Sequence, residues 1–393
     1  MERQRVERAL RWGVPAYLGL VGGGTLALSL WYARSHSVVA VGPWLINYHG
    51  GWVRRGLLGE ILWQVVAHSS LDPTLLLTLE WGVIWGAFLA LFAQALGEQP
   101  FRWPWVFLLL APYTAAFPLN LASQEFLRPE ALYTVTLFAL TVGVLRCSPR
   151  GFDRLTLGVL LLLPLLLLSH EVLVLFLPYL WLLARRRWAS GAPPWLPWAL
   201  LPSALALVGI GLGSRPLQAE QVARIRASWS AVGYPLFGGG WMTPLNALSS
   251  TPAEALAFVG QVWKTWHLGL WCALAFPLSL AAFWPVRHRL RYLAQDRTVR
   301  WLVGLSLGGT LALFALAVDW GRFWRLHLLS WLALALSVPT QQGRPWPQEA
   351  ASTPIPRWTW LLLVLYALGW RLGFQCKMFP SFLVQLTWPW WPR

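Results

Sequence analysis

The chain has 393 residues, of which 57% are hydrophobic and only 12% are charged, and this balance excludes an ordinary soluble domain. Its mean hydropathy is +0.51, long apolar runs recur along it, and many of its 30 tryptophans lie at the ends of those runs, as in interfacial belts. The net charge of +16 is spread over arginines between the runs, which indicates membrane orientation and contact with membrane lipids and argues against nucleic-acid binding.

These features predict one all-α integral membrane domain over residues 1–393, a polytopic helical membrane protein with about 11 transmembrane helices. The three cysteines, Cys147, Cys272 and Cys376, are far apart and lack metal-ligand spacing. The sequence contains no P-loop, dinucleotide fingerprint, nucleophile elbow or HExxH motif, so it predicts no soluble cofactor.

The first transmembrane helix is expected over residues 12–33, after a cytoplasmic N-terminus, and residues 34–74 then form the first outer loop. Within this loop, Arg54 and Arg55 lie off an apolar face at helical spacing, which consists of Val53, Leu57, Leu58, Ile61, Leu62, Val65 and Val66. The pattern predicts an interfacial helix led by two arginines. It is either a plain amphipathic connector or a place where a guanidinium fork binds a lipid phosphate at headgroup level.

Three further spans are expected, over residues 74–96, 103–119 and 131–145. The second outer loop, which joins the last two of them, is short and rich in polar side chains, including Gln124, Glu125 and Arg128. Glu130 precedes the fourth span directly, where the helix dipole favours an acidic side chain, and this effect explains Glu130 without a functional role.

The stretch Leu155–Arg187 is apolar except at its midpoint, Ser169-His170-Glu171. Each arm is about 20 Å long as a helix, whereas the hydrocarbon core is about 30 Å thick. The stretch forms either one long helix with His170 and Glu171 at mid-membrane or two short helices in a V. Arginine clusters at 146–154 and 185–187 mark the cytoplasmic face and favour the V, with His170 and Glu171 near the outer face. Ionisable residues at that depth indicate function, and a polar turn at a hairpin tip is the alternative.

The remaining spans are expected over residues 198–213, 266–286, 301–318, 323–338 and 358–373, which leaves the C-terminus outside. The basic loop 287–300 is the clearest cytoplasmic anchor. The largest outer loop, residues 214–262, is unusually long for a segment without a function of its own. Within it, Thr251-Pro252-Ala253-Glu254 predicts a capped helix start, as Asp72-Pro73 does for the second span.

Asp319 and Arg322 are three residues apart at the junction of two spans, so they share a face of a continued helix. One interpretation is a local ion pair that closes a helical hairpin. The other is that Asp319 serves as a base or metal ligand while Arg322 steers a phosphate.

The predicted topology brings the unexplained polar residues to the outer face. The candidate catalytic residues are Asp319, Glu171 and His170. The candidate substrate-binding residues are His49, Arg54, Arg55, Gln124, Glu125, Arg128 and Arg322. Carboxylates, arginines and histidine together suit an anionic phosphate ligand with a general base beside it. A divalent cation held by Glu171 and Asp319 is compatible with this set, but no spacing specifies a metal site.

Three short motifs carry a resemblance: the run from Gly51 to Gly59, Ser169-His170-Glu171, and Asp319-Trp320-Gly321-Arg322. They resemble motifs of a group of uncharacterised bacterial polytopic membrane proteins, whose layout is similar to GT-C glycosyltransferases and polysaccharide polymerases. The resemblance implies use of a lipid-linked sugar at the outer membrane face. GT-C enzymes usually have an acidic residue in the first outer loop, which often serves as the catalytic base. The same region of this chain contains His49 and Glu60, and Asp72 lies just before the second span. The resemblance therefore identifies none of these residues as the base.

The resulting hypothesis is a GT-C-like membrane glycosyltransferase of the bacterial inner membrane, which uses a polyprenyl-phosphate-linked sugar for cell-envelope glycan assembly. Arginines would hold the phosphate, and a carboxylate or histidine would deprotonate the acceptor. One alternative is a transporter or flippase for a lipid-linked or small anionic substrate, with the outer polar cluster at one end of its pathway. The third hypothesis is that the protein is a structural subunit of a membrane complex.

Overall fold

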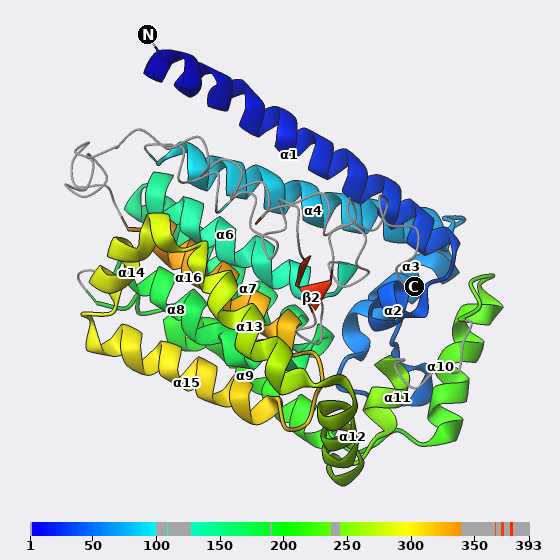
Figure 1. Ribbon diagram of the computed structural model, residues 1–393. Coiled ribbons are helices and arrows are strands. Elements are labelled where there is room, and N and C mark those ends of the chain that lie inside the picture. Colours follow the sequence, from blue (N-terminus) through cyan, green and yellow to red (C-terminus); the bar gives the residue numbers. More distant parts are fainter. Residues whose placement is uncertain are drawn as a thin grey trace.

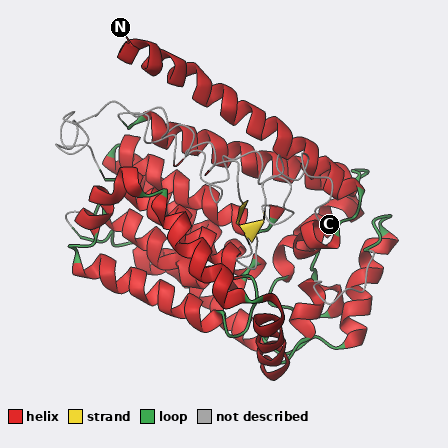
Figure 2. Ribbon diagram, viewed as in Figure 1, coloured by secondary structure: helices red, strands yellow, loops and turns green. Residues whose placement is uncertain are grey.

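A computed structural model describes residues 2–99, 108, 127–188, 191–236, 244–338, 366, 371–372 and 378–379. These residues are helical apart from loops and one short strand pair, in which β1 (Arg371–Leu372) runs antiparallel to β2 (Met378–Phe379) (Figures 1 and 2). The all-α class predicted from the sequence is therefore confirmed for the described part of the chain.

The first half of the chain forms the helices α1 (Glu2–Arg34), α2 (Val38–Val41), α3 (Gly56–His68), α4 (Pro73–Gly97), α6 (Glu130–Arg146), α7 (Pro149–Ser169) and α8 (Leu177–Arg185). The second half forms α9 (Leu196–Leu212), α10 (Ala219–Ala231), α11 (Pro244–Ser249), α12 (Pro252–Trp266), α13 (Leu268–Ala281), α14 (Arg287–Leu293), α15 (Arg297–Leu313) and α16 (Trp320–Leu336). Short 3-10 turns include η2 (Tyr48–Gly50), η5 (Glu171–Phe176) and η6 (Trp284–Val286). The two predicted helix starts are confirmed: Asp72 accepts a hydrogen bond from the Leu75 amide at 3.0 Å, and Thr251 and Glu254 form a capping box.

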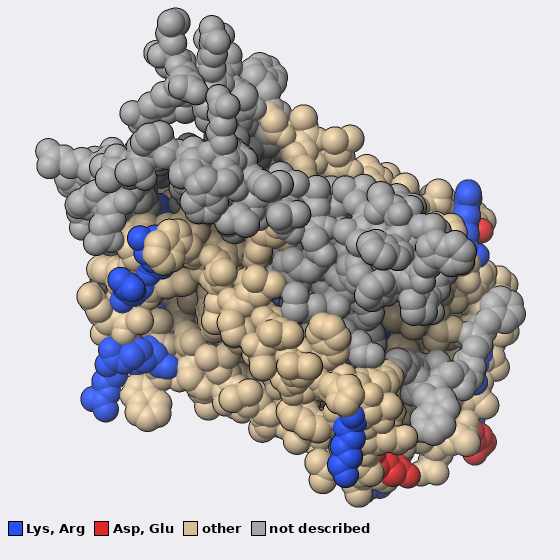
Figure 3. Space-filling model, viewed as in Figure 1, with Lys and Arg blue, Asp and Glu red and all other residues tan. Residues whose placement is uncertain are grey.

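Three of the described helices are long and apolar enough to cross a membrane: Ala16–Arg34 within α1, Pro73–Gly97 and Pro149–Ser169. A fourth candidate is the pair Leu268–Ala281 and Trp284–Leu293, which is bent by 52° at its break. On the face drawn in Figure 3, the visible charged side chains lie toward the two ends of the molecule, with an uncharged surface between them. The chain is thus a helical membrane protein.

The number of such helices is smaller than the sequence predicts. Five helices that coincide with expected spans, α6, α9, α13, α15 and α16, are only 14 to 17 residues long. At about 1.5 Å per residue they measure roughly 21–26 Å, less than the hydrocarbon core of about 30 Å. The expected spans 103–119 and 358–373 lie almost wholly outside the described residues. The structure therefore gives three to four candidate spans in place of about eleven.

Helix α16 lies at the centre of the bundle, in contact with α6, α8, α13 and α14 (Figure 1). Nearly all of its residues are buried, which places its polar side chains Arg322, His327 and Ser330 inside the bundle together with the apolar ones. On the other side of α6, α4 packs between α6 and α1. Because α16 begins at one end of the bundle and finishes at the other, its two ends mark the two ends of the molecule.

The predicted V over residues 155–187 is confirmed. Helix α7 stops at His170, whose extended backbone (φ −161°, ψ 99°) interrupts the helical path, and α8 then returns. Arg187 donates a hydrogen bond to the Cys147 carbonyl, and the Trp188 indole donates to the Asp153 carboxylate at 3.3 Å. These contacts bring the two ends of the hairpin together, so its tip at His170 and Glu171 lies at the opposite end.

Ion pairs join the loops that the sequence predicts to be cytoplasmic. Arg146 contacts Glu98 at 2.6 Å, and Arg185 contacts Asp296 at 3.3 Å. At the same end, the fully buried Arg289 donates hydrogen bonds to the Gln99 side chain and, at 3.3 Å, to a carbonyl in the last turn of α16. These basic loops therefore gather at one end of the bundle.

The first outer loop and the loop at 214–262 pack against each other. Trp229 of α10 donates to the Leu45 carbonyl at 2.6 Å, and Asn47 donates to Ser228 at 2.8 Å. A small second core joins the two loops, made of Ile46, Val53, Leu217, Ile225, Leu245 and Leu248. The two loops thus fold as one unit that holds the start of α3 in place.

The residues of helix α3 that are buried within the protein include Leu58, Leu62 and Val66. Ile61 and Val65, on the predicted apolar face, are exposed on the protein surface, which is where an interfacial helix presents apolar side chains to the membrane. The opening glycines of α3 make close contacts: a Cβ at Gly56 would meet the Tyr48 ring, and one at Gly59 would meet the Ile46 backbone.

Candidate functional site

Four segments bring ionisable side chains together at the end of the bundle opposite the basic loops. They are the residues just before α3, the start of α6, the break after α7, and the start of α16. We call the cluster the ionic site; its members are Arg54, Arg55, Glu130, His170, Glu171, Asp319 and Arg322. Arg128 lies close enough to act electrostatically on His170.

The outer layer of the ionic site is an arginine fork on a carboxylate. Arg55 donates to both oxygens of Glu171, from Nε to Oε2 and from Nη2 to Oε1, each at 2.6 Å. Arg54 Nε lies 3.4 Å from Oε1 of the same carboxylate. The three side chains are 17% to 27% exposed, so this layer is accessible from outside. Bidentate contacts of this kind are the geometry in which arginine binds carboxylates and phosphates.

The inner layer is centred on Glu130. Its Oε1 lies 3.1 Å from His170 Nε2 and 3.3 Å from Arg322 Nε. Arg322 also donates from Nη2 to Asp319 Oδ2 at 2.6 Å, so it bridges two carboxylates. The side chains of Glu130 and His170 are only 4% and 3% exposed, so these two residues are sealed from solvent, whereas Asp319 at the edge of the layer is 26% exposed.

Several buried atoms of the inner layer lack an aligned hydrogen bond. They include both carboxylate oxygens of Glu130 and Nδ1 of His170. Buried polar atoms in proteins nearly always have a partner, and an exception indicates a missing water or ion or a chemical role. The inner layer is thus a place where a proton, a water or a polar group of a ligand completes the hydrogen bonding.

Charge controls the ionisation of the hairpin tip, which lies just beyond the end of α7. Burial alone would raise the pKa of Glu171, but Arg55 and the other nearby cations lower it to about 2. Burial, and then the charge of Arg55, hold the pKa of His170 well below its usual value. At neutral pH, Glu171 is ionised and His170 is neutral. The four arginines of the region face three carboxylates, which leaves one formal positive charge and favours an anionic ligand.

The structure brings together most of the predicted site residues: Arg54, Arg55, Arg128, His170, Glu171, Asp319 and Arg322. His49 differs from these residues, because its exposed ring packs edge-on against Trp63, with ring centroids 4.0 Å apart. Gln124 and Glu125 lie outside the described residues.

Sequence reasoning missed Glu130. The helix dipole explains an acidic residue in the first turn of α6, and that explanation hid the contacts with His170 and Arg322. The available signal was a carboxylate at the start of an otherwise apolar helix, two residues after Arg128.

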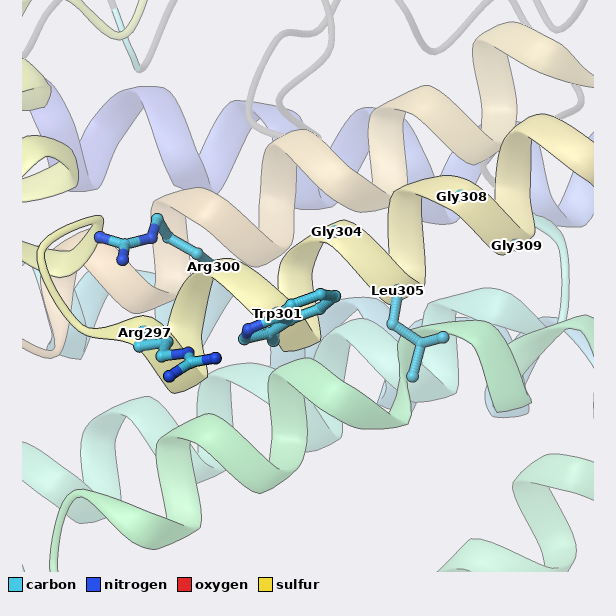
Figure 4. A pocket seen from close by; sticks show the side chains of 7 residues that line it. All are labelled: Arg297, Arg300, Trp301, Gly304, Leu305, Gly308 and Gly309. Carbon is cyan, nitrogen blue, oxygen red and sulfur yellow. The ribbon is translucent and has the colours of Figure 1, made fainter.

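A groove of about 760 Å³ follows one face of α15 (Figure 4). Its lining residues are Arg297, Arg300, Trp301, Gly304, Leu305, Gly308 and Gly309. The arginines stand at the basic end of the bundle, where Asp296 contacts Arg185. None of these residues belongs to the ionic site, so the groove and the site are separate features. Within the described part of the chain, no three His, Cys, Asp or Glu side chains are arranged to hold a metal ion.

Comparisons with protein-family models, with curated proteins and with solved structures find no match to this chain. The fold and the site together define a helical membrane protein with a layered ionic site at one end of its bundle. Its function has to be inferred from the residues of that site.

Proposed function

We propose that this protein is a GT-C-like membrane glycosyltransferase of the bacterial inner membrane. It takes a sugar from a polyprenyl-phosphate carrier at the outer face, for assembly of a cell-envelope glycan. The observation that carries this proposal is the ionic site itself, in which accessible arginines lie directly over a sealed histidine and carboxylate. An anion-binding layer beside a proton-accepting group is what transfer from a sugar phosphate requires.

The proposal gives each layer a role. Arg54 and Arg55 bind the carrier phosphate and stabilise the charge that develops on it. An imidazole with one nitrogen against a carboxylate and the other without a partner has the arrangement of a general base, and His170 fits it, since Nε2 lies 3.1 Å from Glu130 Oε1 and Nδ1 lacks a partner. The acceptor hydroxyl loses its proton to this base as its oxygen bonds to the anomeric carbon of the sugar. The bond between that carbon and the phosphate oxygen breaks, and the polyprenyl phosphate leaves.

The membrane arrangement belongs to the same proposal. About eleven spans, a cytoplasmic N-terminus and an external C-terminus place the joined basic loops inside, in accordance with the positive-inside rule. Helices of about 21–26 Å are accommodated by local thinning of the bilayer or by tilted, re-entrant paths.

A transporter or flippase is the second candidate, and a polar row inside the bundle favours it. Tyr133 contacts Ser330 at 2.8 Å, and His327 contacts Tyr179 at 2.7 Å, in the part of α16 between its two ends. The buried Arg289 follows at the basic end. Polar groups at both ends and in the middle of a bundle are what a pathway across the membrane needs.

The deciding experiment uses the purified protein in proteoliposomes with a short-chain polyprenyl-phosphate sugar inside or outside the vesicles. Release of polyprenyl phosphate that is lost in Arg55→Gln and retained in Arg224→Gln supports the enzyme. Arg224 is the matched control, since it pairs with Glu220 at 2.5 Å on the exposed side of α10. Movement of the intact donor across the vesicle without cleavage supports the transporter and contradicts the enzyme.

A further inference from the structure

Arg54 and Arg55, which bind the carrier phosphate in the proposed function, already contact an anionic group of the protein, the Glu171 carboxylate. Glu171 fills the fork of Arg55 with two hydrogen bonds of 2.6 Å and also contacts Arg54 at 3.4 Å. A phosphate binds an arginine through the same two parallel N–H contacts as a carboxylate. The ligand and Glu171 therefore compete for the same atoms.

We propose that Glu171 is a resident stand-in for the phosphate of the ligand. It occupies Arg54 and Arg55 while the site is empty, and the phosphate displaces it on binding. This inference rests on the proposed function, because it takes from it that Arg54 and Arg55 receive a phosphate-bearing headgroup. It adds that the empty site is held closed by a carboxylate of the protein itself.

The position of Glu171 allows the exchange. It follows His170, where the chain leaves the α7 helix in an extended conformation, and it is the first residue of the short η5 turn. Its side chain can turn outward without breaking the hydrogen bonds of α7. The three side chains involved are 17% to 27% exposed, whereas Glu130 and His170 beneath them are sealed. The exchange therefore takes place in the open layer and leaves the inner layer intact.

The charge balance explains why a stand-in is present. Without Glu171, Arg54 and Arg55 would carry two adjacent positive charges that are partly withdrawn from water, and burial already lowers the pKa of Arg54. An internal carboxylate removes part of that repulsion. The carboxylate also lowers the affinity of the protein for the ligand, because the ligand binds only the fraction of molecules in which Glu171 has left the arginine fork.

Binding of two probes, inorganic phosphate and farnesyl phosphate, tests the proposal on the full-length protein in detergent. Glu171→Gln removes the competing charge and is expected to tighten binding about tenfold for a phosphate that uses the fork. Arg55→Gln is expected to abolish binding. Glu220→Gln is the matched control, because it removes a carboxylate from an exposed Glu–Arg pair on α10 and is expected to leave binding unchanged. Stronger binding of farnesyl phosphate than of inorganic phosphate identifies a lipid-borne headgroup, and equal binding identifies free phosphate.

The outcomes separate the stand-in from the proposed function. If Glu171→Gln binds both probes as weakly as the unaltered protein, or more weakly, while Arg55→Gln binds neither, the phosphate site stands and the stand-in is wrong. If the unaltered protein and Glu171→Gln both bind neither probe, the phosphate site of the proposed function is wrong as well.

Glu171→Gln leaves two arginines without their partner, so its folding is measured in parallel. The stand-in predicts that phosphate raises the melting temperature of Glu171→Gln more than that of the unaltered protein, since the added anion replaces the lost carboxylate. A Glu171→Gln protein that phosphate does not stabilise contradicts the proposal. Glu171→Asp keeps the charge on a shorter side chain, and its affinity is expected to lie between the two.

Discussion

Two buried histidines show how differently this chain treats polar groups inside the bundle. Both ring nitrogens of His327 have neutral partners: the Tyr179 hydroxyl lies 2.7 Å from Nδ1, and the Thr310 hydroxyl lies 2.9 Å from Nε2. Trp331 donates to Tyr179, and Thr310 donates to the Ser306 carbonyl. A single assignment of protons, inferred from these distances, satisfies every group in the chain of hydrogen bonds.

His170, in contrast, lies among charged side chains, and its hydrogen bonding is incomplete. Its Nε2 faces the Glu130 carboxylate at 3.1 Å, and its Nδ1 has no hydrogen-bond partner. A fully satisfied polar network rigidifies a core, whereas a partly satisfied one is costly unless something else binds there. The His327 network is therefore complete and stabilises the bundle as it stands, whereas the ionic site has hydrogen-bonding capacity left for a ligand.

The largest effect is expected from Arg322→Gln, because Arg322 bridges Glu130 and Asp319. The substitution leaves the carboxylates of Glu130 and Asp319 without their arginine partner, and Glu130 is buried. We therefore expect the free energy of unfolding to fall by about 3–5 kcal/mol. The additional change Glu130→Gln is expected to recover part of that loss, as measured by denaturation in detergent. A double variant that is no more stable than Arg322→Gln would contradict the coupling of these two residues.

His327→Leu is expected to cost about 2–4 kcal/mol, because it leaves the buried Tyr179 hydroxyl without its acceptor and the buried Thr310 oxygen without its donor. Thermal unfolding in detergent measures the loss, and His327→Gln, which retains donor and acceptor groups, serves as the control. If both variants melt with the unaltered protein, the network has no stabilising role.

Acid is expected to weaken the ionic site. The pKa of Glu171 is lowered from 4.5 to about 2 in the folded protein. The stabilisation from Glu171 is therefore complete above about pH 5 and is lost as the pH falls toward 2, by an amount on the order of 2–3 kcal/mol. Melting temperatures across this range are expected to fall less steeply in Glu171→Gln. Glu220→Gln, at a fully exposed carboxylate, is the control and is expected to follow the unaltered protein.

The smallest stability effect is expected from His170→Leu, at less than about 1 kcal/mol, because this ring has one unpartnered nitrogen and sits beside cations that repel its charged form. Donor turnover in proteoliposomes is expected to be lost in the same variant. A loss of stability as large as that of His327→Leu would remove the distinction between the two histidines.

The sequence by itself determined the helical membrane class, the V with its tip at His170, and the capped starts at Asp72 and Thr251. An ion pair between Asp319 and Arg322 was one of its two interpretations of these residues, and the structure has them 2.6 Å apart. These features depend on composition or on residues within a few positions of one another, where helical spacing and capping fix the geometry. Three to four helices of the described residues are long and apolar enough to cross a membrane, so the predicted number of about eleven spans is not confirmed there; apolar runs predict helices but do not fix where each one breaks.

Only the tertiary structure decided which polar residues meet. Arg55 and Glu171 are 116 positions apart, and Glu130 meets His170 and Arg322 from three different helices or turns. It also places the ring of His49, one of the candidate substrate-binding residues, against Trp63. A helix that rotates by one residue, about 100°, turns its side chain toward a different neighbour. Such rotations are set by close packing between helices, as at Gly56 and Gly59, and not by the local pattern of the residues that form the site.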